Sequence, residues 1–137
     1  MSKPFIDSNV ILYLLSDDAG KADKAESIVA AGGIISVQVL NEITSICHKK
    51  LKMDWVEIEA VLDAIKANLD IVPLTEKTHA LAVQICKRYQ LSFYDAHICA
   101  AAIEAGANLL LSEDMQDGML LDDIAIKNPF NGFQKQT

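Results

Sequence analysis

The sequence predicts an α/β fold, a three-layer α/β/α sandwich with a central parallel sheet of four or five strands. Its short apolar runs are continuous instead of alternating, which is typical of strands that are covered on both faces. Longer segments with a helical period separate these runs, and strands joined through helices pair in parallel. The chain has 137 residues, of which 51% are hydrophobic, so we expect a single domain over residues 1–137.

The first two expected strands each precede a pair of helices. The apolar run Pro4–Ile6 predicts the first strand, and helical periodicity follows over Ser8–Leu15 and Lys21–Ala30. Glycines at positions 32 and 33 lie where the end of that helix needs a left-handed residue. The second strand is expected over Ile34–Ser36, and the helix Val37–Lys50 follows it.

The remaining elements continue this alternation. Asp54 and Glu57 have the spacing of a capping box, which predicts the start of a helix over Trp55–Asn68. The next elements in chain order are a strand over Asp70–Pro73, helices over Lys77–Tyr89 and Phe93–Ala105, a strand over Asn108–Leu111 and a weaker one over Ile124–Ile126.

Composition excludes several classes of protein. The formal net charge is −7, with Arg88 as the only arginine, so the chain is not expected to bind nucleic acid through its own positive field. The three cysteines lie far apart and form no Cys-x-x-Cys pair, which excludes a disulfide framework and a zinc knuckle. No stretch is apolar enough for a signal peptide or a membrane span, so we expect a protein of the reducing cytoplasm.

Two aspartates follow predicted strands. Asp7 comes directly after the first strand, and Asp114 lies just beyond the fourth. Open parallel sheets bind ligands at the carboxyl ends of their strands, which makes both side chains candidates for a site. Each also has an ordinary interpretation: Asp7 is placed to cap the helix that begins at Ser8, and Asp114 suits a turn.

Asp95 lies on the apolar stripe of its predicted helix, in line with Ile98, Ala102 and Ala105. A carboxylate on that stripe points toward the sheet, where an isolated charge is costly unless a counter-charge is present. The alternative is that Asp95 forms the second half of a capping box with Ser92.

Glu42 lies at the border of the apolar stripe of the helix over residues 37–50. The alternative here is a boundary glutamate whose stem packs while its carboxylate stays in water. Together with the three aspartates, however, Glu42 indicates one acidic cleft with no adjacent Lys or Arg, in which each acid would raise the pKa of the others. A hard divalent cation relieves that repulsion, and oxygen ligands without His or Cys suit Mg²⁺ or Mn²⁺.

Four segments together resemble the PIN domain of VapC-type toxins: FIDSNV, VLNEI, SFYDAHICAAA and LLSEDMQDG. The resemblance spans residues 4 to 130 and includes the closing segment Ile126–Phe130. It implies an Mg²⁺- or Mn²⁺-dependent endoribonuclease, the toxin of a type II toxin–antitoxin pair. The acids that it implies as catalytic are Asp7, Glu42, Asp95 and Asp114, with Asp7, Asp95 and Asp114 as metal ligands. Ser8, Asn9 and Ser112 match the small polar positions that accompany these acids, and we expect them to bind substrate.

Family members often carry a further acid after the last of the four, a region that Gln116 and Asp117 occupy in this chain. In the expected mechanism a bound metal activates water and shields the phosphate, and Glu42 holds a second ion or orients the attacking water. Five cations are candidates for steering the RNA strand, although a solvated helix face is their ordinary interpretation: Lys49, Lys50, Lys52, Lys87 and Arg88.

The resemblance also implies two protein partners, a cognate antitoxin that inserts a segment into the acidic cleft and a second copy of the chain in a homodimer. An antitoxin that offers arginine to the carboxylates suits the charge of the cleft. Trp55 is a candidate for an interface, with a place in the core as its alternative.

Two other functions remain open. A phosphoacceptor signalling domain has a similar fold, but it needs an Asp at the end of the third strand, and here Pro73, Leu74 and Thr75 follow that strand. A non-catalytic interaction module of the same fold would keep the acids without using them.

Overall fold

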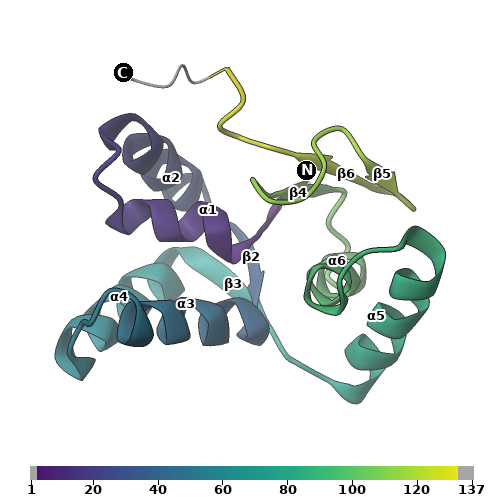
Figure 1. The fold of residues 1–137 in the computed structure, drawn as a ribbon, viewed down its shortest axis with the longest axis horizontal. Coiled ribbons are helices and arrows are strands. Elements are labelled where there is room, and N and C mark those ends of the chain that lie inside the picture. The colour runs from purple at the N-terminus through teal and green to yellow at the C-terminus, as the bar shows by residue number, and fades with distance from the viewer. Residues whose placement is uncertain (1–2, 133–137) are drawn as a thin grey trace.

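The central sheet has six strands in the order β3-β2-β1-β4-β6-β5, and the computed structural model describes residues 3–132 (Figure 1). All neighbouring strands are parallel except β5, which pairs antiparallel with β6. The strands are β1 (Phe5–Ile6), β2 (Gly33–Ser36), β3 (Leu69–Val72), β4 (Leu109–Leu111), β5 (Leu120–Leu121) and β6 (Ile124–Lys127). The predicted α/β class with a mostly parallel sheet is therefore confirmed.

The sheet has one strand more than the four or five that we expected. The additional strand, β5, is only two residues long and forms a hairpin with β6. Asp122 turns this hairpin with a φ of 51°. So short a strand has no hydrophobic period of its own, and its pairing with β6 depends on the strand that follows it.

Helices cover both faces of the sheet. The cluster α1 to α4 lies on one side, and α5 and α6 lie on the other (Figure 1). Their bounds are α1 (Ser8–Leu12), η1 (Tyr13–Leu15, a 3₁₀ turn), α2 (Ala19–Ala31), α3 (Val37–Lys49), α4 (Trp55–Asn68), α5 (Glu76–Tyr89) and α6 (Phe93–Glu104).

The expected boundaries differ from the observed ones at the two helices that follow β1. The segment expected as one helix over Ser8–Leu15 tightens into the 3₁₀ turn η1 after Leu12. Helix α2 begins at Ala19, two residues before the expected start, because the Asp18 carboxylate caps it by accepting from the Lys21 backbone N–H. These corrections leave the order of the elements unchanged.

Strand register brings together the ends of two strands that are distant in the sequence. Ile6 of β1 pairs with Leu111 of β4, so the residues after them, Asp7 and Ser112, emerge at the same edge of the sheet. Buried apolar side chains from the sheet and from both helical layers form the core beneath this edge. Within residues 3–132, no helix is long and apolar enough to cross a membrane.

Candidate active site

Asp7 is the most enclosed acid of the site, with 4% of its surface exposed. One carboxylate oxygen, Oδ1, accepts from the Ser8 backbone N–H over 2.8 Å, which caps α1 as the ordinary interpretation expected. The other, Oδ2, accepts from the Ser112 hydroxyl over 2.9 Å and from the Asn9 side-chain amide over 3.2 Å. Side chains from both strand ends therefore hold this carboxylate in place.

Burial raises the pKa of Asp7 to about 6, even though hydrogen bonds from Ser112 and Ser8 favour the charged form. The nearby charges of Glu42 and Asp95 raise the pKa further. None of the three ion pairs found within residues 3–132 includes Asp7. The Asp7 carboxylate is thus buried and close to other acids, and it forms no ion pair within the described residues.

Glu42 projects from α3 toward the same site. Its Oε2 accepts from the Ser8 hydroxyl over 2.7 Å, and the Gln38 side-chain amide lies 3.5 Å from its Oε1. Ser8 also places its hydroxyl 3.5 Å from Asp7 Oδ1. Ser8 therefore links the acid after β1 to the acid on α3.

Asp95 lies half-buried in the first turn of α6. The Ser92 hydroxyl accepts from its backbone N–H over 3.2 Å and caps the helix start. Within residues 3–132 the Asp95 carboxylate accepts no bond from the Ser92 backbone N–H, so only the Ser92 half of the expected capping box forms. Burial raises the pKa of the Asp95 carboxyl, and the charge of Asp114 adds to that rise, while the Ser92 hydroxyl opposes it. The Ser92 cap therefore coexists with a half-buried Asp95 carboxylate.

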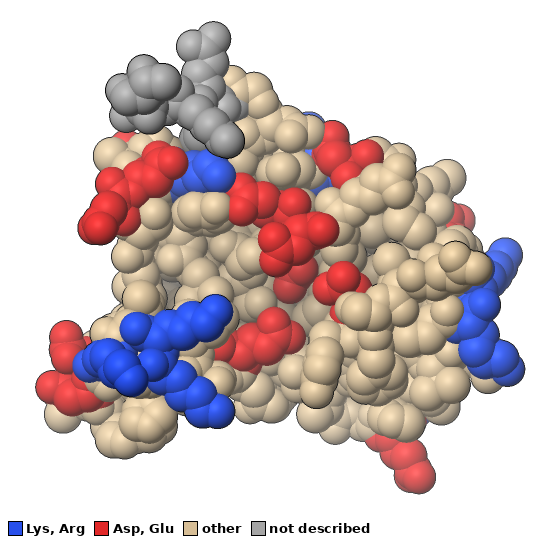
Figure 2. Space-filling model, in the orientation of Figure 1, with Lys and Arg blue, Asp and Glu red and all other residues tan. Residues whose placement is uncertain are grey.

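Asp114 is exposed beyond the end of β4, and it is the outermost of the four acids. Electrostatic repulsion connects the four as a series: Glu42 and Asp95 act on Asp7, and Asp114 acts on Asp95. Figure 2 shows acidic side chains running through the middle of one face, with Lys and Arg gathered mainly toward its lower left and right edges.

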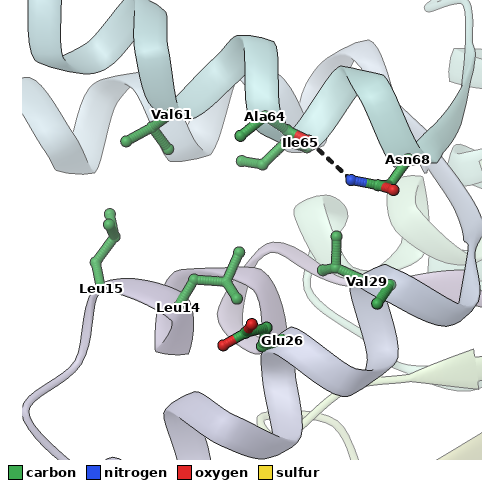
Figure 3. A pocket seen from close by; sticks show the side chains of 9 residues that line it. Leu14, Leu15, Glu26, Val29, Val61, Ala64, Ile65 and Asn68 are labelled. Carbon is green, nitrogen blue, oxygen red and sulfur yellow. Dashed lines mark hydrogen bonds between the residues drawn. The ribbon is translucent and has the colours of Figure 1, made fainter.

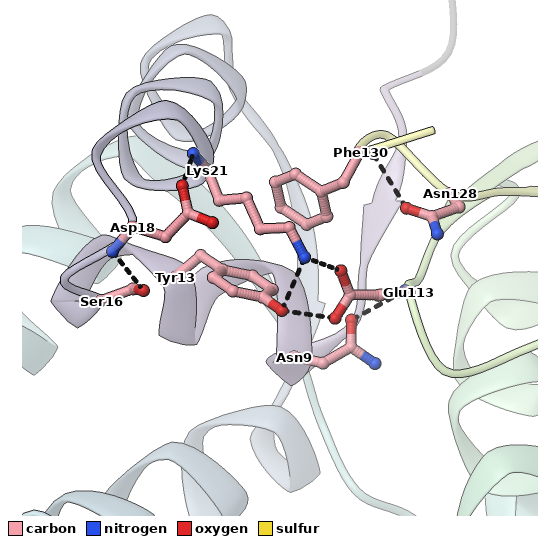
Figure 4. A network of polar contacts seen from close by, with 8 residues as sticks. All are labelled: Asn9, Tyr13, Ser16, Asp18, Lys21, Glu113, Asn128 and Phe130. Atoms are coloured by element: carbon pink, nitrogen blue, oxygen red, sulfur yellow. Dashed lines mark hydrogen bonds and ion pairs between the residues drawn. The ribbon is translucent and has the colours of Figure 1, made fainter. Parts of the chain in front are cut away.

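The neighbouring Glu113 has a different role, which was not predicted from the sequence (Figure 4). Lys21 of α2 lies 2.8 Å from Glu113 Oε2, and the Tyr13 hydroxyl donates to Oε1 over 2.5 Å. Burial raises the pKa of Glu113, but hydrogen bonds from Lys21 and Tyr13 outweigh it and lower the pKa overall. Because Lys21 and Glu113 lie 92 positions apart, no local pattern indicates the pair. This pairing occupies Lys21 and leaves the four acids without its charge.

The polar residues Ser8, Asn9 and Ser112 all contact the acids or the loop that carries them. Besides its bond to Asp7, Asn9 donates to the Ser112 hydroxyl over 3.2 Å and accepts from the Glu113 backbone N–H over 3.0 Å. These bonds tie α1 to the loop after β4. In this structure the three residues position the acids, and their predicted contact with substrate stays a prediction.

The donor set fits a hard divalent cation by its chemistry. Asp7, Glu42, Asp95 and Asp114 offer oxygen only, and burial leaves the Asp7 charge uncompensated. Across residues 3–132, however, no three His, Cys, Asp or Glu side chains converge closely enough to form a ready-made metal site. Mg²⁺ does not need such a cage, because it keeps several waters and is commonly held by one or two carboxylates.

A separate apolar groove lies between η1, α2 and α4 (Figure 3). Its volume is about 360 Å³. Leu14 and Leu15 face Val61 and Ile65 across it, and Glu26 lies at its side. The groove is distinct from the acidic site, since none of the four acids lines it.

The family model of the PIN domain matches residues 5–117 of the chain. This range includes all four acids, the four strands β1 to β4 and the loop that follows β4. No curated protein sequence matches the chain.

Solved structures share the fold over nearly the whole chain. A toxin–antitoxin complex from Klebsiella pneumoniae is similar with a TM-score of 0.71 and 18% identity, covering 92% of this chain and 97% of that one. A DNA-bound VapBC from Salmonella typhimurium gives a TM-score of 0.70 and 17% identity, with 94% and 99% covered. A sarcin–ricin-loop-cleaving VapC toxin from Mycobacterium tuberculosis gives 0.61 and 17%, with 77% and 85% covered.

Proposed function

The chain belongs to the PIN domain family, and from that membership we propose that it is an Mg²⁺- or Mn²⁺-dependent endoribonuclease, the toxin of a type II toxin–antitoxin pair. The observation that carries the proposal is the buried, uncompensated carboxylate of Asp7, which is repelled by Glu42 and Asp95. A protein keeps such a charge at a cost, and clustered acids with a raised pKa are typical of functional sites.

We assign the metal to Asp7, Asp95 and Asp114, which offer carboxylate oxygens at one end of the sheet. A bound Mg²⁺ or Mn²⁺ lowers the pKa of a coordinated water and shields charge on the phosphate. Ser112 and Asn9 fix the direction of the Asp7 carboxylate by donating to Oδ2. This fixed direction keeps the donor in place before substrate arrives.

We propose that Glu42 orients the attacking water and accepts its proton, because a general base must lie within hydrogen-bond reach of the proton that it takes. The Ser8 hydroxyl donates to Glu42 Oε2 and thereby orients this carboxylate toward Asp7. The phosphodiester bond is then hydrolysed by water, with the leaving oxygen taking up a proton from solvent.

The direct test is cleavage of single-stranded RNA by the full chain with Mg²⁺ or Mn²⁺. Asp7→Asn and Asp95→Asn each keep the shape of the side chain and remove its charge, and we expect each to lower the rate at least about 100-fold. Asp63→Asn, an exposed position on α4, is the matched control and should retain full activity. Unchanged metal-dependent cleavage in both site variants would contradict the assignment.

The alternative is a non-catalytic module of the same fold, favoured by the lack of a ready-made group of three metal ligands in the described part of the chain. Calorimetric titration with Mn²⁺ separates the two. The nuclease should bind Mn²⁺ and lose that binding in Asp95→Asn, whereas the inert module should bind no ion at this site in either protein.

We also propose a cognate antitoxin as partner, with the acidic site and the apolar groove as its two contacts. Related folds are found in toxin–antitoxin complexes, which supports the partner class. An antitoxin segment with arginine complements the acids, and its apolar side chains suit the groove beside Leu15. Leu15→Glu should weaken the complex without changing RNA cleavage by the free toxin, while Val56→Glu, an exposed position outside the groove, should change neither.

Homodimerisation in the cytoplasm completes the proposal, with Trp55 in the interface. Trp55 is 54% exposed and stacks on His48 with ring centroids 4.6 Å apart, so a place in the core is excluded within this chain. Its fluorescence should change when the dimer is diluted to monomer. An unchanged spectrum across a measured dissociation would remove Trp55 from the interface.

A further inference from the structure

Two adjoining surface cavities flank the side chain of Tyr94 next to the acidic site. The first has a volume of about 460 Å³ and is lined by Gln38, Asn41, Glu42, Ser45 and Tyr94. The second has about 320 Å³, and Gln38 and Tyr94 line it as well. Ligand pockets in proteins begin at about 300 Å³, so each cavity is large enough for a small ligand.

Tyr94 is an exposed aromatic residue immediately before an acid of the proposed site, Asp95. Its exposed fraction of 66% is large for an aromatic side chain. It belongs to a row of rings: Phe93 lies 5.9 Å from Tyr94 between centroids, and His79 lies 5.3 Å from Phe93. One turn of α6 therefore presents aromatic surface and a carboxylate side by side.

The first cavity connects this aromatic surface to the acids. Glu42, which lines it, accepts from the Ser8 hydroxyl beside Asp7. The opposite wall is formed by α3, where Gln38, Asn41 and Ser45 follow one another at helical spacing. Amide and hydroxyl groups both donate and accept hydrogen bonds, so this wall is able to pair with the polar edge of a base.

The charged residues that line the two cavities limit which ligands can bind there. Neither cavity is lined by Lys or Arg among the residues that the structure describes, and the first is lined by the carboxylate of Glu42, which disfavours a phosphate there. A neutral, planar group with polar edges fits an aromatic platform and an amide wall. The nucleobase next to the cleaved phosphate has this chemistry, because bases of single-stranded RNA stack on exposed aromatic rings.

We propose that Tyr94 is the stacking platform for one nucleobase of single-stranded RNA, and that Gln38 and Asn41 contact the edge of that base. This inference rests on the proposed ribonuclease function, since it assigns a base-binding subsite to the same enzyme. Tyr94 and the two amides select and position the strand, and the four acids carry out the hydrolysis. The amides on α3 decide which base is preferred, because base edges differ in their donors and acceptors.

The test measures binding apart from cleavage, in an Asp7→Asn background that leaves the RNA intact. Fluorescein-labelled homopolymers of A, C or U are titrated in Mg²⁺ buffer, and a gel of each sample verifies that the RNA is whole. Adding Tyr94→Ala should weaken binding by about 5- to 100-fold, the loss typical of one stacked base. Tyr94→Phe keeps the ring and should bind within about twofold of the parent.

Two further variants test base recognition and specificity of the effect. Asn41→Ala should change the ratios between the affinities for the three homopolymers more than it changes their mean affinity. Leu120→Ala removes a side chain that is also 66% exposed, but on β5, and it should leave every affinity unchanged. In the cleaving wild-type background, Tyr94→Ala should raise KM more than it lowers kcat.

Contrary outcomes are equally defined. Equal affinity of the Tyr94→Ala and parent proteins for all three RNAs would overturn the subsite. The subsite would also be overturned if Tyr94→Ala bound RNA normally but had a different molecular mass in solution, measured by light scattering. Tyr94 would then belong to a protein interface. Wild-type protein that cleaves RNA while Tyr94 proves dispensable refutes only the subsite. Wild-type protein that neither binds nor cleaves RNA refutes the ribonuclease proposal itself.

Discussion

The hydroxyl of Ser112 donates a hydrogen bond of 2.9 Å to the carboxylate of Asp7, across 105 positions of the sequence. The pairing of Ile6 with Leu111 in adjacent parallel strands creates this contact, since each partner is the next residue after its strand. The bond favours the charged form of Asp7, although burial still raises the pKa of that carboxyl to about 6. Several measurable consequences depend on this contact and on the acids around it.

Ser112→Ala should destabilise the protein by about 1–2 kcal/mol, because it leaves a buried carboxylate oxygen with one donor fewer. It also removes the oxygen that accepts from the Met115 backbone N–H over 3.3 Å. Urea unfolding monitored by circular dichroism measures the change. Ser27→Ala, on the exposed face of α2, is the control, and equal stability of the two variants would contradict the role of this bond.

Raising the pH from 4 to 7 should destabilise the metal-free wild type by about 1–3 kcal/mol relative to Asp7→Asn, since only the wild type acquires the buried charge. The folded pKa of about 6 lies above the ordinary value of 3.8, so folding favours the protonated acid. The destabilisation by Asp7 is therefore absent below about pH 4, grows as the pH rises toward 6 and is complete above it.

The difference in unfolding free energy between Asp7→Asn and wild type isolates this effect across pH 4 to 7 in the presence of a chelator. The difference between the two proteins is needed because other groups also make stability depend on pH. Burial lowers the pKa of His97, which makes folding less favourable as the pH falls below 6.5. That contribution is common to both proteins and cancels. A difference that does not vary with pH would show that Asp7 is solvated like an ordinary aspartate.

Lys21→Met should destabilise the protein by about 1 kcal/mol and less at high salt, because the ion pair with Glu113 is partly exposed. Methionine keeps the length of the side chain but also loses the cation–π contacts of the Lys21 Nζ, which lies 4.6 Å from the ring centroid of Tyr13 and 5.4 Å from that of Phe130. A double-mutant cycle with Glu113→Gln gives the coupling energy. A coupling energy of zero at low salt would mean that the ion pair seen in Figure 4 does not stabilise the fold in solution.

Mn²⁺ should raise the midpoint of thermal unfolding of the wild-type chain, because an ion that binds only the folded state stabilises it. The increase should shrink as the pH falls below about 6, because protons then compete with the metal for the carboxylate oxygens of Asp7. Asp95→Asn should abolish most of the increase. Glu59→Gln on the exposed side of α4 is the control, and the same increase in all three proteins would point to nonspecific binding.

Much of the fold was predictable because its signals are local. Continuous apolar runs identified β1, β2, β3, β4 and β6, and the helical period identified each covering helix. The start of α2 at Ala19 and the short strand β5 were missed. The start of α2 depends on the capping side chain of Asp18, three positions before the expected start at Lys21. Strand β5 depends on its partner strand β6. Neither leaves a periodic pattern.

The candidate site divides in the same way. The types and order of Asp7, Glu42, Asp95 and Asp114 were visible in the sequence together with the family that they resemble, and their catalytic roles stay predictions. The sequence by itself determined which acids stand at the ends of strands and the starts of helices. Only the tertiary structure decided that Lys21 is bound by Glu113 and that Tyr94 borders a cavity beside Glu42. The physical reason is that periodicity depends on neighbours along the chain, whereas the pairing of charges and the shape of cavities depend on which distant segments the sheet brings together.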